Sequence, residues 1–134
     1  MTVTRGRCLC GSVRYEYSGP ENWRAYCHCE SCRRNTASPV TAFLGVPCET
    51  FRYTGAAPKV YHSSPGVRRS FCADCGTPMA YQSDRFPGEI HLYAASLENP
   101  EAYAPQSHVH CDERLSWFDV KDDLPRHPAG DAAP

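Results

Sequence analysis

Residues 71–78 read Phe-Cys-Ala-Asp-Cys-Gly-Thr-Pro, so two cysteines stand three positions apart and a glycine follows the second. A turn of this kind places the sulfurs of Cys72 and Cys75 on one side, and the glycine tolerates the positive φ that the turn needs. Near the N-terminus, Cys8 and Cys10 are two positions apart, so on a strand both side chains face the same way. The two pairs supply four thiolates, the donor set of a closed tetrahedral zinc site.

A zinc ion held by these two pairs would tie the first strand to a hairpin about 60 residues later in the chain. Binding of this kind contributes on the order of 10 kcal/mol to folding, comparable to the whole stability of a small domain. The chain has nine cysteines, an odd number, and most of them lie in close clusters. In a reducing compartment such clusters are more often metal ligands than disulfides, so we expect a structural zinc ion and a cytoplasmic protein.

A third cluster, Cys27, Cys29 and Cys32, supplies three ligands within six residues. Three protein ligands leave one position for water or substrate, which is typical of catalytic zinc, so we predict a second, open zinc site with these cysteines as the catalytic residues. The alternative is a second closed site completed by a more distant side chain: Cys48, His28 or Cys111. His28 stands between two ligands, and a strand would point it the other way, so we expect it to support or pack rather than to bind.

The ligand set also favours one kind of chemistry. Three thiolates and Zn²⁺ sum to a charge of −1, which makes a weaker Lewis acid than a histidine-bound zinc ion and disfavours a metal-hydroxide hydrolase. A soft substrate suits such a centre better, because a thiol can lose its proton on binding and remain a nucleophilic thiolate. The cluster therefore predicts an enzyme that acts on thiols.

The rest of the chain reads as short strands in one domain. At 134 residues and 14.9 kDa there is room for a single zinc-binding domain, which we place at residues 1–121, followed by a poorly ordered Pro/Ala-rich tail at 122–134. Apolar and polar side chains alternate at residues 12–17 and 89–94, the period of a strand. Further strand-like segments lie at 40–46, 59–63, 68–71, 78–82 and around Val109.

Helical signals are confined to a turn or two after Cys29 and to residues 99–103, where proline follows an asparagine N-cap. We therefore predict a mostly β fold of short antiparallel strands in two sheets, with one or two short helical turns. Trp117 and Phe118 are expected in its core.

Composition excludes some partners. The formal charge of −1 argues against a dedicated binder of nucleic acid or of anionic membranes. No apolar run approaches a membrane span, and we expect no signal peptide at the start. Arg33 and Arg34 follow the open cluster and can attract the carboxylate of a peptide-like thiol, although a solvated surface pair is the alternative. His108 and His110 would share a strand face, as a third metal site or as packed or solvated side chains.

Three motifs carry a family resemblance: Cys8-x-Cys10-Gly11-x-Val13, Cys27-His28-Cys29-x-x-Cys32-Arg33 and Arg69-x-Phe71-Cys72-x-x-Cys75-Gly76-Thr77. Weaker matches lie at Gly55, Tyr61, Ser63 and Ser64, at residues 95–100 and at 116–117. Together, over roughly residues 5–120, the chain resembles the glutathione-dependent formaldehyde-activating enzyme family, which also includes centromere protein V. Ala37 and Ala95 depart from the pattern, since the family usually has glycine at both places.

The resemblance implies the β-tent fold shared with zinc-bearing methionine sulfoxide reductases. It implies a structural zinc ion on Cys8, Cys10, Cys72 and Cys75 and a second zinc ion on the other three cysteines. It further implies a carbon–sulfur lyase of the S-(hydroxymethyl)glutathione synthase type, which condenses glutathione or a similar thiol with formaldehyde or a related aldehyde.

Two other functions compete with this one. The chain could instead be a non-catalytic, zinc-stabilised module that binds proteins in a chaperone-like way. A sulfoxide reductase using Cys48 or Cys111 is less favoured, because neither lies in a nucleophile motif and both read as unligated thiols. Strand edges leave a homodimer open as the oligomeric state.

Overall fold

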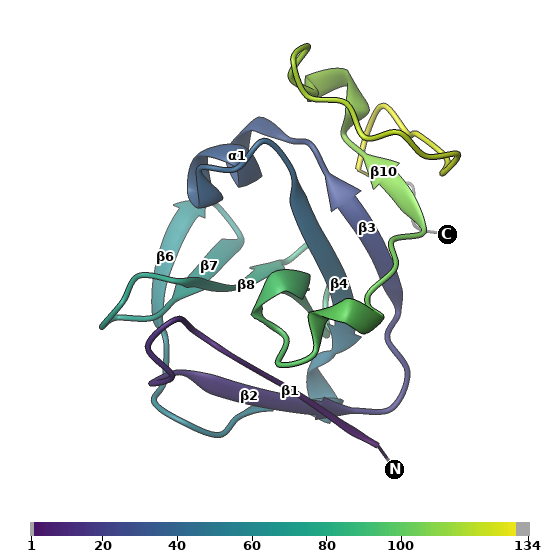
Figure 1. Cartoon of the computed structure of the whole chain (residues 1–134). Helices are drawn as coiled ribbons and strands as arrows, with labels where there is room; N and C mark the ends of the chain where they lie inside the picture. The colour runs from purple at the N-terminus through teal and green to yellow at the C-terminus, as the bar shows by residue number, and fades with distance from the viewer. Residues whose placement is uncertain (1, 131–134) are drawn as a thin grey trace. The chain divides into compact units, whose positions relative to one another are not determined.

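The structure is a computed structural model in which residues 2–130 are described, and strands dominate it (Figure 1). The strands are β1 (Val3–Arg7), β2 (Arg14–Ser18), β3 (Trp23–Cys27), β4 (Thr41–Pro47), β5 (Phe51–Tyr53), β6 (Lys59–Ser64), β7 (Val67–Phe71), β8 (Pro78–Ser83), β9 (Glu89–Tyr93) and β10 (Ser107–Val109). One α-helix, α1 (Glu30–Thr36), and four 3₁₀ turns, η1 (Cys48–Thr50), η2 (Ala94–Ser96), η3 (Pro100–Ala102) and η4 (Cys111–Glu113), complete the described elements. The predicted mostly β class with strands in two sheets is confirmed.

The chain divides into two compact units. Unit 1 comprises Met1–Asn22 and Leu44–Tyr103, and unit 2 comprises Trp23–Phe43 and Ala104–Pro134. Each unit contains one of the cysteine clusters, so each cluster can be described within its own unit. Among the described residues, no helix is both long and apolar enough to cross a membrane.

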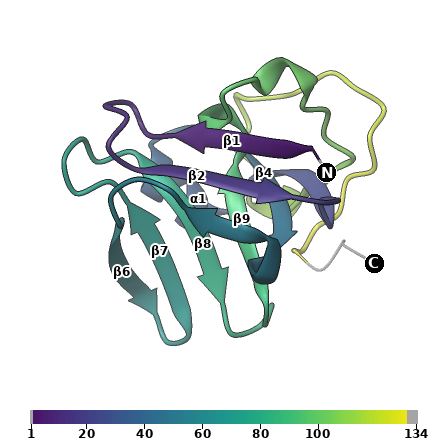
Figure 2. The same ribbon diagram turned by 90° about the horizontal axis from the view of Figure 1, so that it is seen from below.

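Unit 1 contains antiparallel strands, as expected. β1, β2 and β5 form a three-stranded sheet, and β9, β8, β7 and β6 follow one another in a second sheet (Figure 2). The alternation at residues 12–17 is borne out in β2, where Tyr15 and Tyr17 are buried and Arg14 is exposed. β9 is instead buried at four consecutive positions, Ile90 to Tyr93, because both faces of this strand are covered.

Two turns in unit 1 bring cysteines to strand ends. β1 ends directly before Cys8, and β7 ends directly before Cys72. The Gly11 amide donates to the Cys8 carbonyl at 3.2 Å, and the Gly76 amide donates to the Cys72 carbonyl at 2.9 Å. Both glycines have positive φ, 82° and 81°, which confirms why each cysteine pair needs a glycine after it.

Unit 2 departs from the antiparallel expectation. β10 pairs with β3 in parallel, with His108 opposite Tyr26 and Val109 opposite Cys27. Parallel neighbours need a long connection, and here about 80 residues separate the two strands in sequence. No local pattern in the chain could have shown this pairing.

Two expectations for the C-terminal region need correction or restriction. Trp117 is 73% exposed and therefore does not belong to the core. The part of the predicted tail at 122–130 is hydrogen-bonded to residues 108–111 within unit 2: the His108 amide donates to the Pro125 carbonyl at 2.8 Å and the Cys111 amide to the His127 carbonyl at 3.0 Å. The rest of the tail, residues 131–134, lies outside the described residues.

The helix after Cys29 is present, and its end carries strain that a single substitution can remove. α1 stops at Ala37, which has φ 56° and ψ 32°, the left-handed conformation. In this conformation a residue with a Cβ destabilises the folded state by about 1–2 kcal/mol. Glycine avoids that cost, but it gives the unfolded chain more conformational entropy, which lowers stability by about 0.4–1 kcal/mol. We expect Ala37→Gly to raise the free energy of unfolding by about 0.5–1 kcal/mol in urea titrations.

The matched control is Ala57→Gly, an exposed position outside the positive-φ region. There the same substitution should leave stability unchanged or lower it slightly. If Ala37→Gly lost as much stability as the control, the backbone at Ala37 would not be strained.

Candidate metal centres

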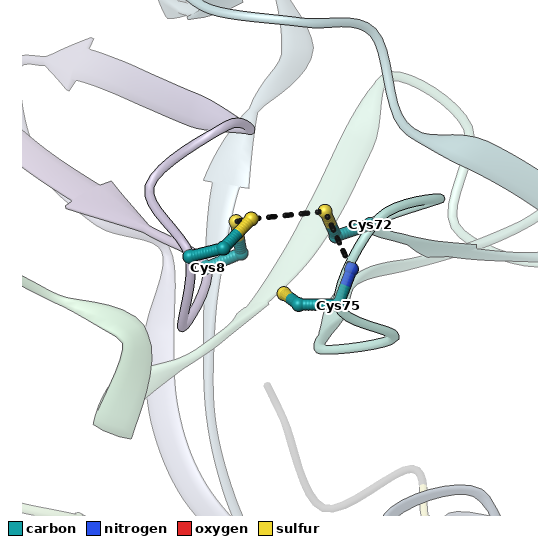
Figure 3. A group of neighbouring side chains, drawn as sticks. Cys8, Cys72 and Cys75 are labelled. Atoms are coloured by element: carbon teal, nitrogen blue, oxygen red, sulfur yellow. Dashed lines mark hydrogen bonds between the residues drawn. The ribbon is translucent and has the colours of Figure 1, made fainter.

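The structure brings the four predicted ligands of unit 1 together, and Figure 3 shows Cys8, Cys72 and Cys75 among them. The sulfurs of Cys8 and Cys10 are 3.6 Å apart, and those of Cys10 and Cys72 are 3.8 Å apart. With Cys75 included, all four sulfurs lie within 4.8 Å of one another. A tetrahedral zinc ion with Zn–S bonds of about 2.3 Å places its sulfurs about 3.8 Å apart, so this group has the spacing that zinc requires.

Hydrogen bonds also prepare these sulfurs to be thiolates. The Val13 amide lies 3.3 Å from the Cys8 sulfur. The Cys75 amide lies 3.4 Å from the Cys72 sulfur, a contact that Figure 3 shows as a dashed line. Thr77 Oγ1 lies 3.2 Å from the Cys75 sulfur and accepts a hydrogen bond from the Leu9 amide at 3.0 Å. Donors of this kind stabilise negative sulfur, and Thr77 links the two halves of the group. Sequence reasoning missed Thr77; its position directly after Cys-Gly was the available signal.

Crowding sets the pKa values of these thiols far apart. Hydrogen bonds from the Thr77 hydroxyl and amide lower the pKa of Cys75 to about 5. At Cys10 a hydrogen bond from the Ser12 amide lowers the pKa, but desolvation and the neighbouring cysteines outweigh it and raise the pKa to about 12. Four adjacent thiolates therefore do not coexist at neutral pH without a cation, which is the condition that a bound metal ion satisfies.

The second cluster lies in unit 2, where β3 ends and α1 begins. The sulfurs of Cys27 and Cys32 are 3.9 Å apart, and that of Cys29 lies within 4.8 Å of both. Cys27 and Cys32 are buried, whereas Cys29 is partly exposed. Cys29 is also the N-cap of α1, since its sulfur accepts a hydrogen bond from the Cys32 amide at 3.3 Å.

This group has three members. Within the described part of the chain, no further cysteine, histidine, aspartate or glutamate lies close enough to all three sulfurs to join it. The sulfur spacing again matches the edge of a zinc tetrahedron, so these residues fit a metal ion with three protein ligands.

Charge in this cluster concentrates on one sulfur. Hydrogen bonds from Cys27 and Cys32 lower the pKa of Cys29 to about 2. Hydrogen bonds with Cys29 and Cys32, followed by burial, raise the pKa of Cys27. Without a metal ion the negative charge therefore favours Cys29 over Cys27, and a bound divalent cation would stabilise further thiolates in the cluster.

The two arginines after the cluster already have protein partners. Arg33 donates from Nε to the His28 carbonyl at 3.4 Å and from Nη2 to the Glu113 carbonyl at 3.2 Å. Arg34 pairs with Glu30 at 2.8 Å on the surface, where its side chain is 77% exposed. Arg33 thus braces the backbone beside the cluster, and Arg34 is the one that solvent reaches more freely.

The remaining singled-out residues lie elsewhere. Among the described residues, neither His108 nor His110 belongs to a group able to hold a metal ion. Cys48 has Gln82 Nε2 3.8 Å from its sulfur, and partial burial raises the pKa of Cys111. Ala95 is exposed in η2, so its methyl group faces no crowded backbone.

Comparison with known proteins gives a consistent result. The model of the glutathione-dependent formaldehyde-activating enzyme family matches residues 3–113. A protein of Halomonas elongata that carries the provisional name of a glutathione-dependent formaldehyde-activating enzyme is 25% identical over 129 residues, covering 89% of this chain and 82% of the relative. An uncharacterized lyase of Schizosaccharomyces pombe is 33% identical over 95 residues, covering 69% of each chain.

A solved structure supports the fold alone. The crystal structure of a Rhodobacter sphaeroides protein superposes with a TM-score of 0.61 at 22% identity, covering 75% of this chain and 97% of that one.

Proposed function

Because the chain belongs to the glutathione-dependent formaldehyde-activating enzyme family, we propose that it joins a small thiol, glutathione in the first instance, to formaldehyde or a related aldehyde. In this reaction the thiol sulfur forms a bond to the carbonyl carbon, the C=O π bond breaks, and the thiol proton ends on the oxygen as a hydroxyl. The product of glutathione and formaldehyde is S-(hydroxymethyl)glutathione, and the reverse reaction makes the enzyme a carbon–sulfur lyase.

The observation that carries this proposal is the contrast between the two cysteine groups. One group offers four sulfurs at zinc spacing, and the other offers three. A zinc ion on the three-cysteine group would supply a soft Lewis acid with one exchangeable position, which holds a substrate thiol in its thiolate form at neutral pH. Such a thiolate is the nucleophile that the addition requires.

The three cysteines of this group differ in exposure, and we assign them different roles for that reason. Cys27 and Cys32 are buried and would hold the ion from within unit 2, while the partly exposed Cys29 would mark the side open to substrate. Arg34, whose ion pair with Glu30 is exposed to solvent, is the side chain that can exchange its partner for a substrate carboxylate. We further propose a reducing compartment, the cytoplasm, because these sulfurs bind metal only when reduced.

The first test is metal analysis of protein purified anaerobically. We expect two zinc ions per chain, and we expect a chelator to remove one of them first, because three thiolates hold zinc less tightly than four. X-ray absorption with added glutathione should then report a fourth sulfur at the more labile site. A single zinc ion per chain, or four protein ligands at both sites, would contradict the proposal.

One observation favours the alternative of a protein-binding module. β6 ends its sheet in unit 1, and all six of its residues are exposed, including Val60 and Tyr61. An edge strand of this kind can pair with a strand of another chain. The Cys29→Ser variant removes one ligand of the three-cysteine site. If the protein were a non-catalytic module, this variant would still bind its partner through the β6 edge.

A further inference from the structure

A chain of hydrogen bonds in unit 2 runs through two buried histidines and ends beside the three-cysteine group. Nε2 of His28 lies 2.9 Å from Nδ1 of His108, and Nε2 of His108 lies 3.0 Å from Oδ2 of Asp122. Both histidines are 1% exposed. Asp122 is held in turn by the Leu124 amide at 3.0 Å and by Arg126 Nη1 at 2.9 Å. Five groups are thus connected from the C-terminal segment to the cluster.

The carboxylate fixes which ring nitrogens carry protons. The pKa of Asp122 is lowered to about 2 by its hydrogen bond with His108, so Asp122 is ionised and can only accept. His108 then donates from Nε2, and a ring whose proton lies on Nε2 accepts at Nδ1. His28 therefore donates from Nε2, which leaves its buried Nδ1 as a bare acceptor with no hydrogen-bond partner. A buried acceptor of this kind is normally satisfied by an ordered water molecule or a ligand.

The ring of His28 is one of three attachments that hold this residue. Its amide donates to the Val109 carbonyl at 3.1 Å, and its carbonyl accepts from Arg33. Because His28 links Cys27 to Cys29 in the chain, the position of its backbone sets the separation and direction of two of the three sulfurs. Side chains that orient metal ligands in this indirect way typically change metal affinity about 10–100-fold when they are removed.

We propose that Asp122, acting through His108, is a positioning residue that holds His28 in one tautomer and thereby sets the metal affinity of the Cys27, Cys29 and Cys32 group. The proposal rests on this group binding a metal ion but not on the reaction proposed for it. Asp122 lies beyond residue 113, where the family match ends, so the C-terminal segment of this chain supplies the support. Asp122 also holds Leu124 and Arg126, which ties the fold of that segment to the same carboxylate.

The test compares metal binding at the two groups in one protein. The variants are Asp122→Asn, whose amide can reverse the hydrogen bond to His108, and His108→Leu, which breaks the chain but keeps Asp122 and its other contacts. In competition with a chelator, both should weaken zinc binding at the three-cysteine group by about 10–100-fold and leave the four-cysteine group unchanged. Asp123→Asn, at the exposed neighbouring position, is the matched control and should change neither.

Two spectroscopic readouts separate positioning from a general loss of structure. With cadmium in place of zinc, ¹¹³Cd spectra should shift only the resonance of the three-sulfur site in both variants. In the metal-free protein, ¹⁵N spectra should show His28 protonated at Nε2 in the wild type and at Nδ1 in Asp122→Asn. Unchanged cadmium resonances and zinc affinity in His108→Leu, or a wild-type His28 protonated at Nδ1, would overturn the proposal. Failure of the wild type to bind a second metal ion would instead count against the proposed function, and the ¹⁵N result would still decide the hydrogen-bond chain.

Discussion

Cys29→Ser is expected to lower thiol–aldehyde condensation to the uncatalysed rate while the protein stays folded. A serine hydroxyl stays protonated at neutral pH and is a poor zinc ligand, so two thiolates would remain and the second ion would be lost. The fold should survive because serine is a good N-cap and can accept the same hydrogen bond from the Cys32 amide that begins α1. We expect the free energy of unfolding to change by less than about 1 kcal/mol.

The measurement is the rate of glutathione-dependent formaldehyde consumption above the uncatalysed background, together with the zinc content of the variant. One zinc ion per chain should remain, on the four-cysteine group. Cys111→Ser is the control, since Cys111 is a cysteine of the same unit that belongs to neither group. A variant that loses its second zinc ion but keeps full activity would show that the reaction does not depend on this group.

The cysteine groups were predictable because their spacing is a local property. A pair three positions apart in a glycine turn places its sulfurs on one side whatever the rest of the chain does, and this arrangement is present at Cys72 and Cys75. The sulfurs of Cys8 and Cys10 also come together, but the expectation of a strand was wrong there, because both residues lie in the turn that follows β1. The alternation in β2 is local in the same sense. Residues 27, 29 and 32 could likewise be grouped from spacing, although the N-cap role of Cys29 could only be seen in the structure.

What the sequence could not show depends on contacts between distant segments. The parallel pairing of β10 with β3 joins residues about 80 positions apart, and it brings His108 to His28. Each histidine read by itself suggested packing or a surface position. Asp122 stood in a segment that composition described as a poorly ordered tail, yet it forms the hydrogen bond that orients both rings. Trp117 was placed in the core from its type alone, and side-chain type does not fix exposure.

Cys72→Ser is expected to unfold at least unit 1, whereas Cys29→Ser is expected to leave the protein folded. Cys72 is 1% exposed, its sulfur lies 3.8 Å from that of Cys10, and it accepts a hydrogen bond from the Cys75 amide. Zinc bound to such a group contributes on the order of 10 kcal/mol, whereas a whole domain is stable by about 5–15 kcal/mol. Losing one of four thiolates therefore removes most of the margin that keeps the unit folded.

Circular dichroism and thermal unfolding would measure this effect, with Cys48→Ser as the control from the same unit. The control should unfold at nearly the wild-type temperature, since Cys48 belongs to neither group. Slow removal of zinc by a chelator should produce the effects of the two variants one after the other. Activity should be lost first, while the protein stays folded, and the folded structure should be lost later. If Cys72→Ser stayed folded with wild-type stability, the four-cysteine group would not be a structural metal site. Hydrogen bonds and packing would then account for the stability of unit 1 without a metal ion.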